Sequence, residues 1–172
     1  MARIIEPESE AIIVQTRKGN RIRCEPPRRS MTPEEEANIR REMERWRGGS
    51  LSRARIAERR GPSYDYNCHG LTFLSRRAWL TEEEAIELVL ADDGYAEVPR
   101  SRVLPGDIAV YRDHAGHIEH TGVVVRVDQH QTLDLPWVLS KWGNAGEYIH
   151  PYDETLYTGT PHFMREGSDG RQ

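Results

Sequence analysis

A succession of short β-rich segments in the second half of the chain constrains the fold more than any other feature. After the turn-forming Pro105-Gly106-Asp107 come the segments IAVYR, HTGVVVRV, WVLSKWG and EYIHP, separated by a loop and by polar turns. Strands that follow one another over such short connections pair in the antiparallel sense. Helical patterns precede this region, so we predict an α+β fold in which helices come first and an antiparallel sheet follows. With 172 residues, 37% of them hydrophobic, the chain is large enough for one core of ordinary domain size.

The first third of the chain has the pattern of a hairpin followed by helices. Residues 11–25 form two β-rich runs around Lys18-Gly19-Asn20, which is a hairpin signal. Thr32-Pro33-Glu34-Glu35 combines an N-cap, a proline at the first helical position and a glutamate three residues after the cap. This motif predicts a helix that ends near Gly48-Gly49. A second short helix is expected over residues 52–60.

The pattern changes after Gly61-Pro62. Asn67 to about Trp79 is compatible with a helix, and Thr81 with Glu84 three residues later forms a capping box for another helix that continues through Leu90. We accordingly divide the chain into two parts: a basic N-terminal extension of hairpin and helices over residues 1–60, and a domain over residues 61–172.

The extension is basic and the remainder is acidic. Between Arg17 and Arg60 there are fourteen Lys and Arg against seven Asp and Glu, a balance of +7, so a chain of net charge −4 carries −11 elsewhere. The arginines alternate with glutamates in EEEANIRREMERWR, as on a solvated helix face, and no nucleic-acid motif accompanies them. We therefore expect no nucleic-acid partner, although the extension could dock a protein partner such as an inhibitor, an immunity protein or a delivery factor.

The sequence carries no signal for a membrane. No apolar run approaches the roughly 18 to 20 residues that cross a bilayer, and MARIIEPESEAIIVQ has glutamates where a secretory signal needs a basic start and an apolar stretch. We expect a cytoplasmic protein that has no membrane contact and is exported, if at all, by a dedicated secretion system. In that compartment Cys24 and Cys68 are expected to be free thiols.

The segment YDYNCHGLTF raises the question of chemistry, because Cys68 opens a predicted helix. A thiol at a helix N-terminus has a lowered pKa, and the free backbone N–H groups there can hold an oxyanion. Acyl transfer also needs a base, and His120 is the best placed, since a strand can orient its imidazole and Gly122 leaves room for a neighbouring element. His69 is a poor base for Cys68, because adjacent helical residues point about 100° apart.

Three motifs resemble the NlpC/P60 cysteine peptidases. Asn67-Cys68-His69-Gly70-Leu71 resembles their Asp-Cys-Ser-Gly-Phe segment around the nucleophile, Leu104-Pro105-Gly106-Asp107-Ile108 resembles their Pro-Gly-Asp-Leu turn, and His120-Thr121-Gly122-Val123-Val124 resembles their His-Val-Gly-Ile strand. Their order, with 52 residues from Cys68 to His120, is also similar, and the likeness covers about residues 62 to 150. It implies a papain-like core in which a nucleophile helix packs on an antiparallel sheet, and cleavage of peptide or amide bonds through a Cys–His pair without a cofactor. The related CHAP amidases share this arrangement.

The resemblance also implies a third polar residue that orients the imidazole. Folding HTGVVVRV back on WVLSKWG about a turn near Gln131 sets His120 opposite Trp142, so Ser140 and Asn144 share a face with His120. Asn144 is the first choice and Ser140 the second. A slip of one residue would instead offer Lys141, which cannot accept a hydrogen bond. His150 is a further candidate if the chain turns back after Gly146.

The expected substrate is a peptide or a fragment of peptidoglycan. The resemblance points to peptidoglycan stem peptides, which would fit a toxin effector or a phage enzyme, and an intracellular protein substrate is the other choice. Tyr66 and Trp142 are candidate substrate-binding residues, although core packing is an alternative for Trp142.

Two alternative functions are open at this point. The chain could be a papain-like binding module without turnover. It could also hold zinc through His114, His117 and His120, with Cys68 or His69 as the fourth ligand, but a loop running into a strand suits that spacing less well than a helix. The hydrolase hypothesis requires no metal.

Overall fold

The computed structural model describes residues 11–49, 55–129 and 134–167. Most of the strands form one antiparallel sheet, in the spatial order β3 (Ala57–Arg60), β8 (Glu147–Pro151), β7 (Asp134–Lys141), β6 (Ile118–Gln129), β5 (Ile108–Arg112), β9 (His162–Glu166) and β4 (Tyr95–Glu97). The other elements are β1 (Ile12–Gln15), β2 (Arg21–Cys24), α1 (Pro33–Gly48), α2 (Cys68–Phe73), α3 (Glu83–Asp92) and the 3-10 turn η1 (Arg100–Arg102).

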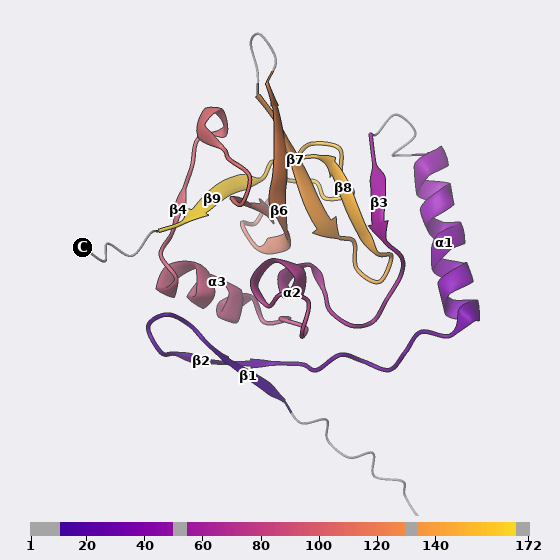
Figure 1. The fold of residues 1–172 in the computed structure, drawn as a ribbon, viewed down its shortest axis with the longest axis horizontal. Helices are drawn as coiled ribbons and strands as arrows, with labels where there is room; N and C mark the ends of the chain where they lie inside the picture. The colour runs from indigo at the N-terminus through magenta and orange to yellow at the C-terminus, as the bar shows by residue number, and fades with distance from the viewer. Residues whose placement is uncertain (1–10, 50–54, 130–133, 168–172) are drawn as a thin grey trace, which may run out of the picture.

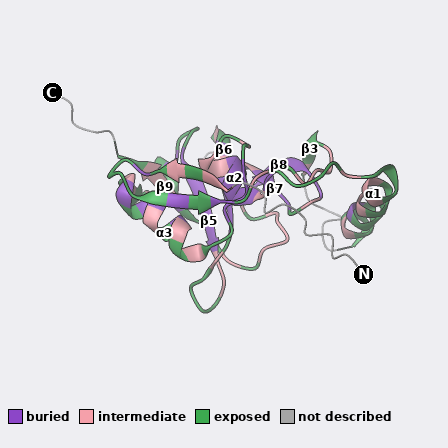
Figure 2. Cartoon of the chain, turned by 90° about the horizontal axis from the view of Figure 1, so that it is seen from below, coloured by how far each residue is buried: buried purple, intermediate pink, exposed green. Residues whose placement is uncertain are grey.

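The α+β class predicted from the sequence is confirmed. Figure 1 shows α2 and α3 beside the lower end of the main sheet, with the β1–β2 hairpin running below them and α1 standing at the sheet edge formed by β3. Buried residues are concentrated in the strands of the sheet, whereas α1 is largely exposed (Figure 2). No helix in the described ranges is long and apolar enough to cross a bilayer.

The N-terminal hairpin and the first helix lie where the sequence predicts them. β1 and β2 pair around Gly19, whose φ of 90° is the left-handed conformation that glycine adopts readily. Ile22 and Cys24 from β2 pack in the same core as α3, and Cys24 is a free thiol. α1 begins with the expected capping box at Thr32 and ends before Gly49.

The prediction of a helix over residues 52–60 is wrong for the part of this segment that the structure describes. Ala57–Arg60 is the strand β3, which pairs with β8, while residues 52–54 lie outside the described ranges. Helical propensity in this short segment is outweighed by the backbone hydrogen bonds that the open edge of the sheet offers. The last residues assigned to the extension are therefore an edge strand of the main sheet.

The two later helices are shorter than expected. α2 ends at Phe73 rather than near Trp79, because Ser75 and Arg76 adopt left-handed φ angles of 50° and 67° that a helix cannot contain. The capping box at Thr81 does not form: α3 starts at Glu83, and the Thr81 hydroxyl bonds Glu25 instead.

The predicted strands are present, and their register near His120 is the expected one. Gly122 pairs with Ser140 and Val123 with Leu139, which is the register expected for this part of the two strands. β6 begins two residues before His120, and a register shift between β5 and β6 leaves Glu119 as a bulge. The turn expected near Gln131 lies outside the described residues. β4 and β9, which complete the sheet beyond β5, have no counterpart among the predicted strands.

Candidate active site

Asn67 fixes the start of α2 and therefore the position of Cys68. Its Oδ1 accepts from Gly70 N at 2.8 Å, as an N-cap does, and from Leu80 N at 3.2 Å, while its Nδ2 donates to Leu80 O at 2.7 Å. An aspartate could accept both hydrogen bonds but could not donate the third. Asparagine at this position thus ties the start of α2 to the segment that precedes α3.

A chain of hydrogen bonds joins α2 to β6. Thr72 Oγ1 donates to the Cys68 carbonyl, and Thr121 Oγ1 donates to Thr72 Oγ1, both at 3.0 Å. Because the single proton of Thr121 is used there, His69 Nδ1 must be the donor in its 3.0 Å contact with Thr121 Oγ1. Burial lowers the pKa of His69 to about 4, so it is neutral. The hydrogen bond from His69 to Thr121 therefore helps to fix α2 against β6.

The Cys68 thiol is buried and protonated. Its residue is only 8% exposed, and burial raises its pKa to about 11. Backbone hydrogen bonding from Thr121, His69 and Cys68 itself favours the thiolate but does not offset burial. The expected lowering of the pKa is therefore wrong for this conformation, because a six-residue helix supplies less stabilisation than desolvation removes. The N–H groups that could hold an oxyanion are nevertheless present.

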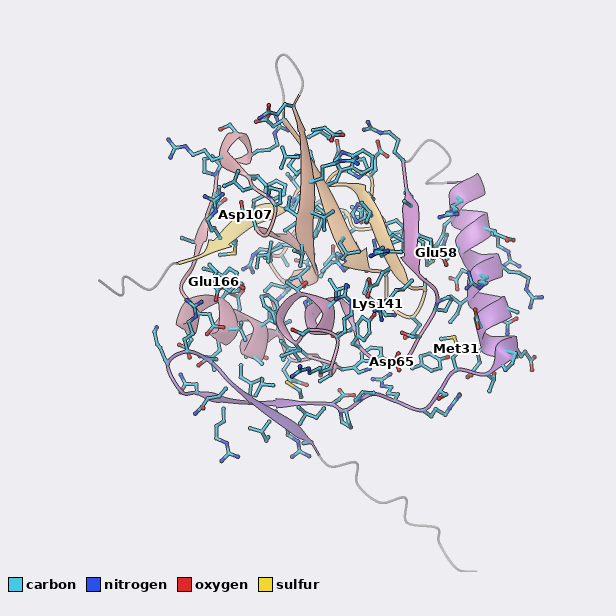
Figure 3. The ribbon with its side chains drawn as sticks, viewed as in Figure 1. Met31, Glu58, Asp65, Asp107, Lys141 and Glu166 are labelled. Carbon is cyan, nitrogen blue, oxygen red and sulfur yellow. The ribbon has the colours of Figure 1, made fainter. Side chains whose placement is uncertain are left out.

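The positive charge of Lys141 favours the Cys68 thiolate, and sequence reasoning missed this role. Its Nζ donates to Ser63 O at 3.0 Å and to Gly143 O at 2.7 Å. Burial lowers its pKa to about 8, while Glu147, Asp65 and Cys68 act in the opposite direction. Figure 3 shows Lys141 and Asp65 at the same end of the sheet, next to α2. The strand pattern could have placed Lys141 on the face opposite Ser140, but no local signal marks that face as the thiol side.

Tyr66 belongs to a buried ionic network and is not available to a substrate. It is only 3% exposed, and its hydroxyl donates to Glu147. Arg76 binds the same carboxylate through Nε at 2.6 Å and Nη2 at 3.1 Å. The left-handed backbone at Arg76 brings the guanidinium to this carboxylate. The substrate-binding role expected for Tyr66 is therefore wrong in this conformation.

His120 is completely buried and has no hydrogen-bond partner on either ring nitrogen. It stacks on Tyr157, with ring centroids 3.9 Å apart and planes 13° apart, and the tilted ring of Tyr111 lies with its centroid 5.5 Å away. Burial lowers its pKa well below the usual value, and the charges of His69 and His150 act in the same direction. His120 is thus a neutral imidazole with its polar atoms unsatisfied, which is costly in a folded protein.

Cys68 and His120 are not hydrogen-bonded to each other in the described structure. Thr121 faces α2 through its contacts with His69 and Thr72, and strand alternation turns the neighbouring His120 toward Tyr111 and Tyr157 instead. Tyr157 is linked to both residues. It stacks on His120. Burial raises its pKa, and negative charge at Cys68 raises that pKa further.

Neither residue chosen to orient His120 does so. Ser140 shares a face with Gly122, as expected, but its Oγ bonds His150 Nε2 at 2.8 Å. His150 Nδ1 donates to Pro151 O at 2.7 Å, and burial lowers the His150 pKa to about 4. Asn144 lies beyond the end of β7, where strand alternation no longer holds, and its Oδ1 has no partner. The chain does turn back after Gly146, and this brings His150 to Ser140 rather than to His120.

The residues of the zinc alternative do not converge. His114 and His117 are exposed in the loop before β6, His117 pairs with Glu83 at 3.0 Å, and His120 is buried. Within the described ranges, no group of three His, Cys, Asp or Glu side chains is arranged to hold a metal ion.

Trp142 lines a groove next to this site. The groove has a volume of about 510 Å³ and lies between α1, the turn that joins β7 to β8, and the segment at Tyr157. Trp142 is only 3% exposed and stacks on Tyr148, with ring centroids 4.7 Å apart. It thus packs in the core and lines the groove at the same time.

Comparison with known proteins gives no family assignment for this chain. No family model matches the chain, and no curated protein or solved structure is significantly similar to it.

Proposed function

We propose that the protein is a papain-like cysteine hydrolase that cleaves a peptide or amide bond with Cys68 as nucleophile and His120 as base. The observation that carries the proposal is the fully buried His120 imidazole with both ring nitrogens unpartnered. An orphaned buried polar group is favoured where a functional state supplies the partner. Tyr157, which stacks on this imidazole, is also linked to Cys68, because negative charge at Cys68 raises the Tyr157 pKa.

The environment of the thiol suits acyl transfer. Backbone N–H groups at Thr121, His69 and Cys68 favour negative charge there, as they would favour the oxyanion of a tetrahedral intermediate. Lys141 adds a positive charge on the same side. These groups stabilise the thiolate and the oxyanion more than the neutral thiol, which is the requirement for catalysis.

The steps follow from these groups. The described conformation is a resting state, in which the thiol and imidazole are both neutral and Tyr157 covers His120. When Tyr157 moves aside, His120 accepts the thiol proton and Cys68 Sγ attacks the amide carbonyl. His120 then gives the proton to the leaving amine, and water hydrolyses the thioester. The substrate class is a peptide, either a peptidoglycan stem peptide or a protein segment.

The test is the rate at which iodoacetamide labels Cys68 at pH 7, in a Cys24→Ser background that leaves one thiol. Wild type should label slowly, because a thiol with a pKa of about 11 is almost entirely protonated at that pH. Tyr157→Ala should label faster by about tenfold or more. His120→Ala added to Tyr157→Ala should remove most of that gain, because the base is lost.

Tyr157→Phe is the matched control, since it keeps the ring stacked on His120 and should stay slow. If Tyr157→Ala is fast with or without His120, Tyr157 only shields the thiol, and the Cys–His pair is wrong. If labelling is slow in every variant, a binding module without turnover is the better reading of this fold.

A further inference from the structure

Several buried polar atoms without partners, among the residues that the structure describes, belong to residues in or next to the groove. Five buried side-chain nitrogen or oxygen atoms in the described ranges lack a hydrogen-bond partner: both ring nitrogens of His120, Nε1 of Trp142, Oδ1 of Asn144 and Oγ1 of Thr155. Trp142 and Asn144 line the groove described above, and Thr155 directly precedes its lining residue Leu156. Such groups are normally paired, so their clustering indicates a ligand that offers both donors and acceptors.

The rest of the groove is mostly apolar. α1 contributes Ile39, Met43 and Trp46, which recur at the spacing of one helix face, and Leu156 faces them from the opposite side. Ile39 and Trp46 stay half-buried and so keep apolar surface available. The groove therefore combines an apolar wall with two lining residues, Trp142 and Asn144, that each carry a buried unpaired donor or acceptor, groups that an extended peptide could satisfy.

The groove is continuous with the catalytic groups. Tyr157 lines it and also stacks on His120. A ligand that enters between α1 and the turn after β7 would therefore meet the side chain that covers the base. Glu42 is the charged residue in the lining, and its carboxylate disfavours an acidic ligand such as the glutamate-bearing stem peptide.

We propose that this groove is the specificity subsite of the hydrolase, and that it selects a peptide with a bulky apolar side chain next to the scissile amide. The inference rests on the proposed function and deepens it. Trp142 Nε1 donates to a peptide carbonyl, Asn144 Oδ1 accepts from a peptide N–H, and the apolar wall of α1 holds the side chain. The N-terminal helix, which the family resemblance does not cover, thus determines what is cut.

The test is binding to the Cys68→Ala protein, which cannot turn substrate over. The probes are capped pentapeptides Ac-Ala-Ala-X-Ala-Ala-NH2, with X as Leu, Phe, Ala, Lys or Glu, titrated by calorimetry. The Leu and Phe peptides should bind about tenfold or more tightly than the Ala and Glu peptides. Ile39→Ala and Trp46→Ala should reduce this discrimination, and Glu44→Ala, an exposed change on the same helix, should leave it intact.

Trp142→Phe separates the two parts of the subsite. This change keeps an aromatic ring but removes the Nε1 donor, so all five peptides should weaken by a similar factor while the preference for Leu and Phe persists. Equal binding of all five peptides to the Cys68→Ala protein would overturn the proposal. So would unchanged discrimination in Ile39→Ala, or tighter binding of the stem peptide L-Ala-γ-D-Glu-diaminopimelate than of the Leu peptide.

Wild-type turnover distinguishes this inference from the function on which it rests. If the Cys68→Ala protein binds selectively but wild type cleaves none of the peptides, the groove stands as a peptide site and the hydrolase proposal fails. If wild type cleaves all five with the same kcat/KM, the hydrolase proposal stands and the subsite fails.

Discussion

At the scale of single residues, burial rather than helix position determines the charge state of the candidate nucleophile. Cys68 opens a helix, as the sequence predicts, yet desolvation raises its pKa to about 11. Compensation comes from Lys141 on β7, whose pKa is lowered to about 8 and which therefore stays mostly charged at pH 7. The charge state of Cys68 therefore depends on groups that lie far from it in the sequence.

Replacing Lys141 should weaken the thiolate. In the Cys24→Ser, Tyr157→Ala background, where the reagent has access, Lys141→Met should slow iodoacetamide labelling several-fold at pH 7, because the cation that lowers the Cys68 pKa is lost. Lys141→Arg keeps a positive charge and is the control, with a smaller expected effect. Equal labelling rates in Lys141→Met and its parent would remove Lys141 from the site.

Replacing Asn67 should cost more than replacing an exposed cap. Asn67→Ala loses three hydrogen bonds around the start of α2, and we expect a loss of about 2 to 4 kcal/mol in the free energy of unfolding. Thr32→Ala, at the exposed cap of α1, should cost about 1 kcal/mol. Asn67→Asp should fall between wild type and Asn67→Ala, since it keeps the acceptor. Urea denaturation measures all three, and equal costs at positions 67 and 32 would contradict this account.

At the scale of elements, the main sheet includes a strand from the segment assigned to the extension. β3 pairs with β8 and covers its outer edge, and Gly146, with a φ of 119°, passes so close to Arg60 that an added Cβ would lie 2.4 Å from its carbonyl oxygen. The main sheet therefore includes residues before residue 61, and a cut at that position would remove one of its strands.

Removing β3 should leave β8 as an unpaired edge strand that promotes association between chains. A chain that begins at residue 62 leaves the outer backbone groups of β8 unpaired, and we expect it to associate and to melt at a lower temperature than the full chain. A chain that begins at residue 55 keeps β3 and is the matched control. Size-exclusion chromatography and thermal melting compare the two, and identical behaviour would show that β3 contributes nothing to the sheet.

At the scale of the whole molecule, three neutral histidines are buried around one end of the sheet. The pKa values of His69 and His150 are lowered to about 4, and that of His120 is lowered well below its usual value, all chiefly by burial. In the unfolded chain these residues bind protons near pH 6.5. Between these values the unfolded state holds more protons than the folded state, so the free energy of unfolding falls as the pH falls.

The protein should therefore be acid-sensitive in a defined window. The stability that the neutral histidines contribute is complete above about pH 6.5 and is lost as the pH falls toward 4, with a limiting slope of about 4 kcal/mol per pH unit if all three titrate. Urea denaturation at intervals from pH 7.5 to 4.5 measures the slope. His150→Gln should reduce it, and His114→Gln, an exposed change, should not. A flat profile from pH 7 to 5 would contradict the assignment of neutral buried rings.

The sequence by itself determined the elements whose causes are local. The hairpin around Gly19, the capping box at Thr32 and the register of Gly122 opposite Ser140 all follow from residues close together in the chain or from strand alternation. These patterns also predicted the α+β class and singled out Cys68 and His120.

Only the tertiary structure decided how those residues meet. The strand at residues 57–60, the pairing of Ser140 with His150 instead of His120, the buried network that takes Tyr66, and the cation beside Cys68 all depend on groups far apart in the sequence. Burial and long-range pairing are properties of the packed chain, and a protonation state follows from them. For that reason the sequence singled out candidate side chains, whereas the fold decided their partners and their charge.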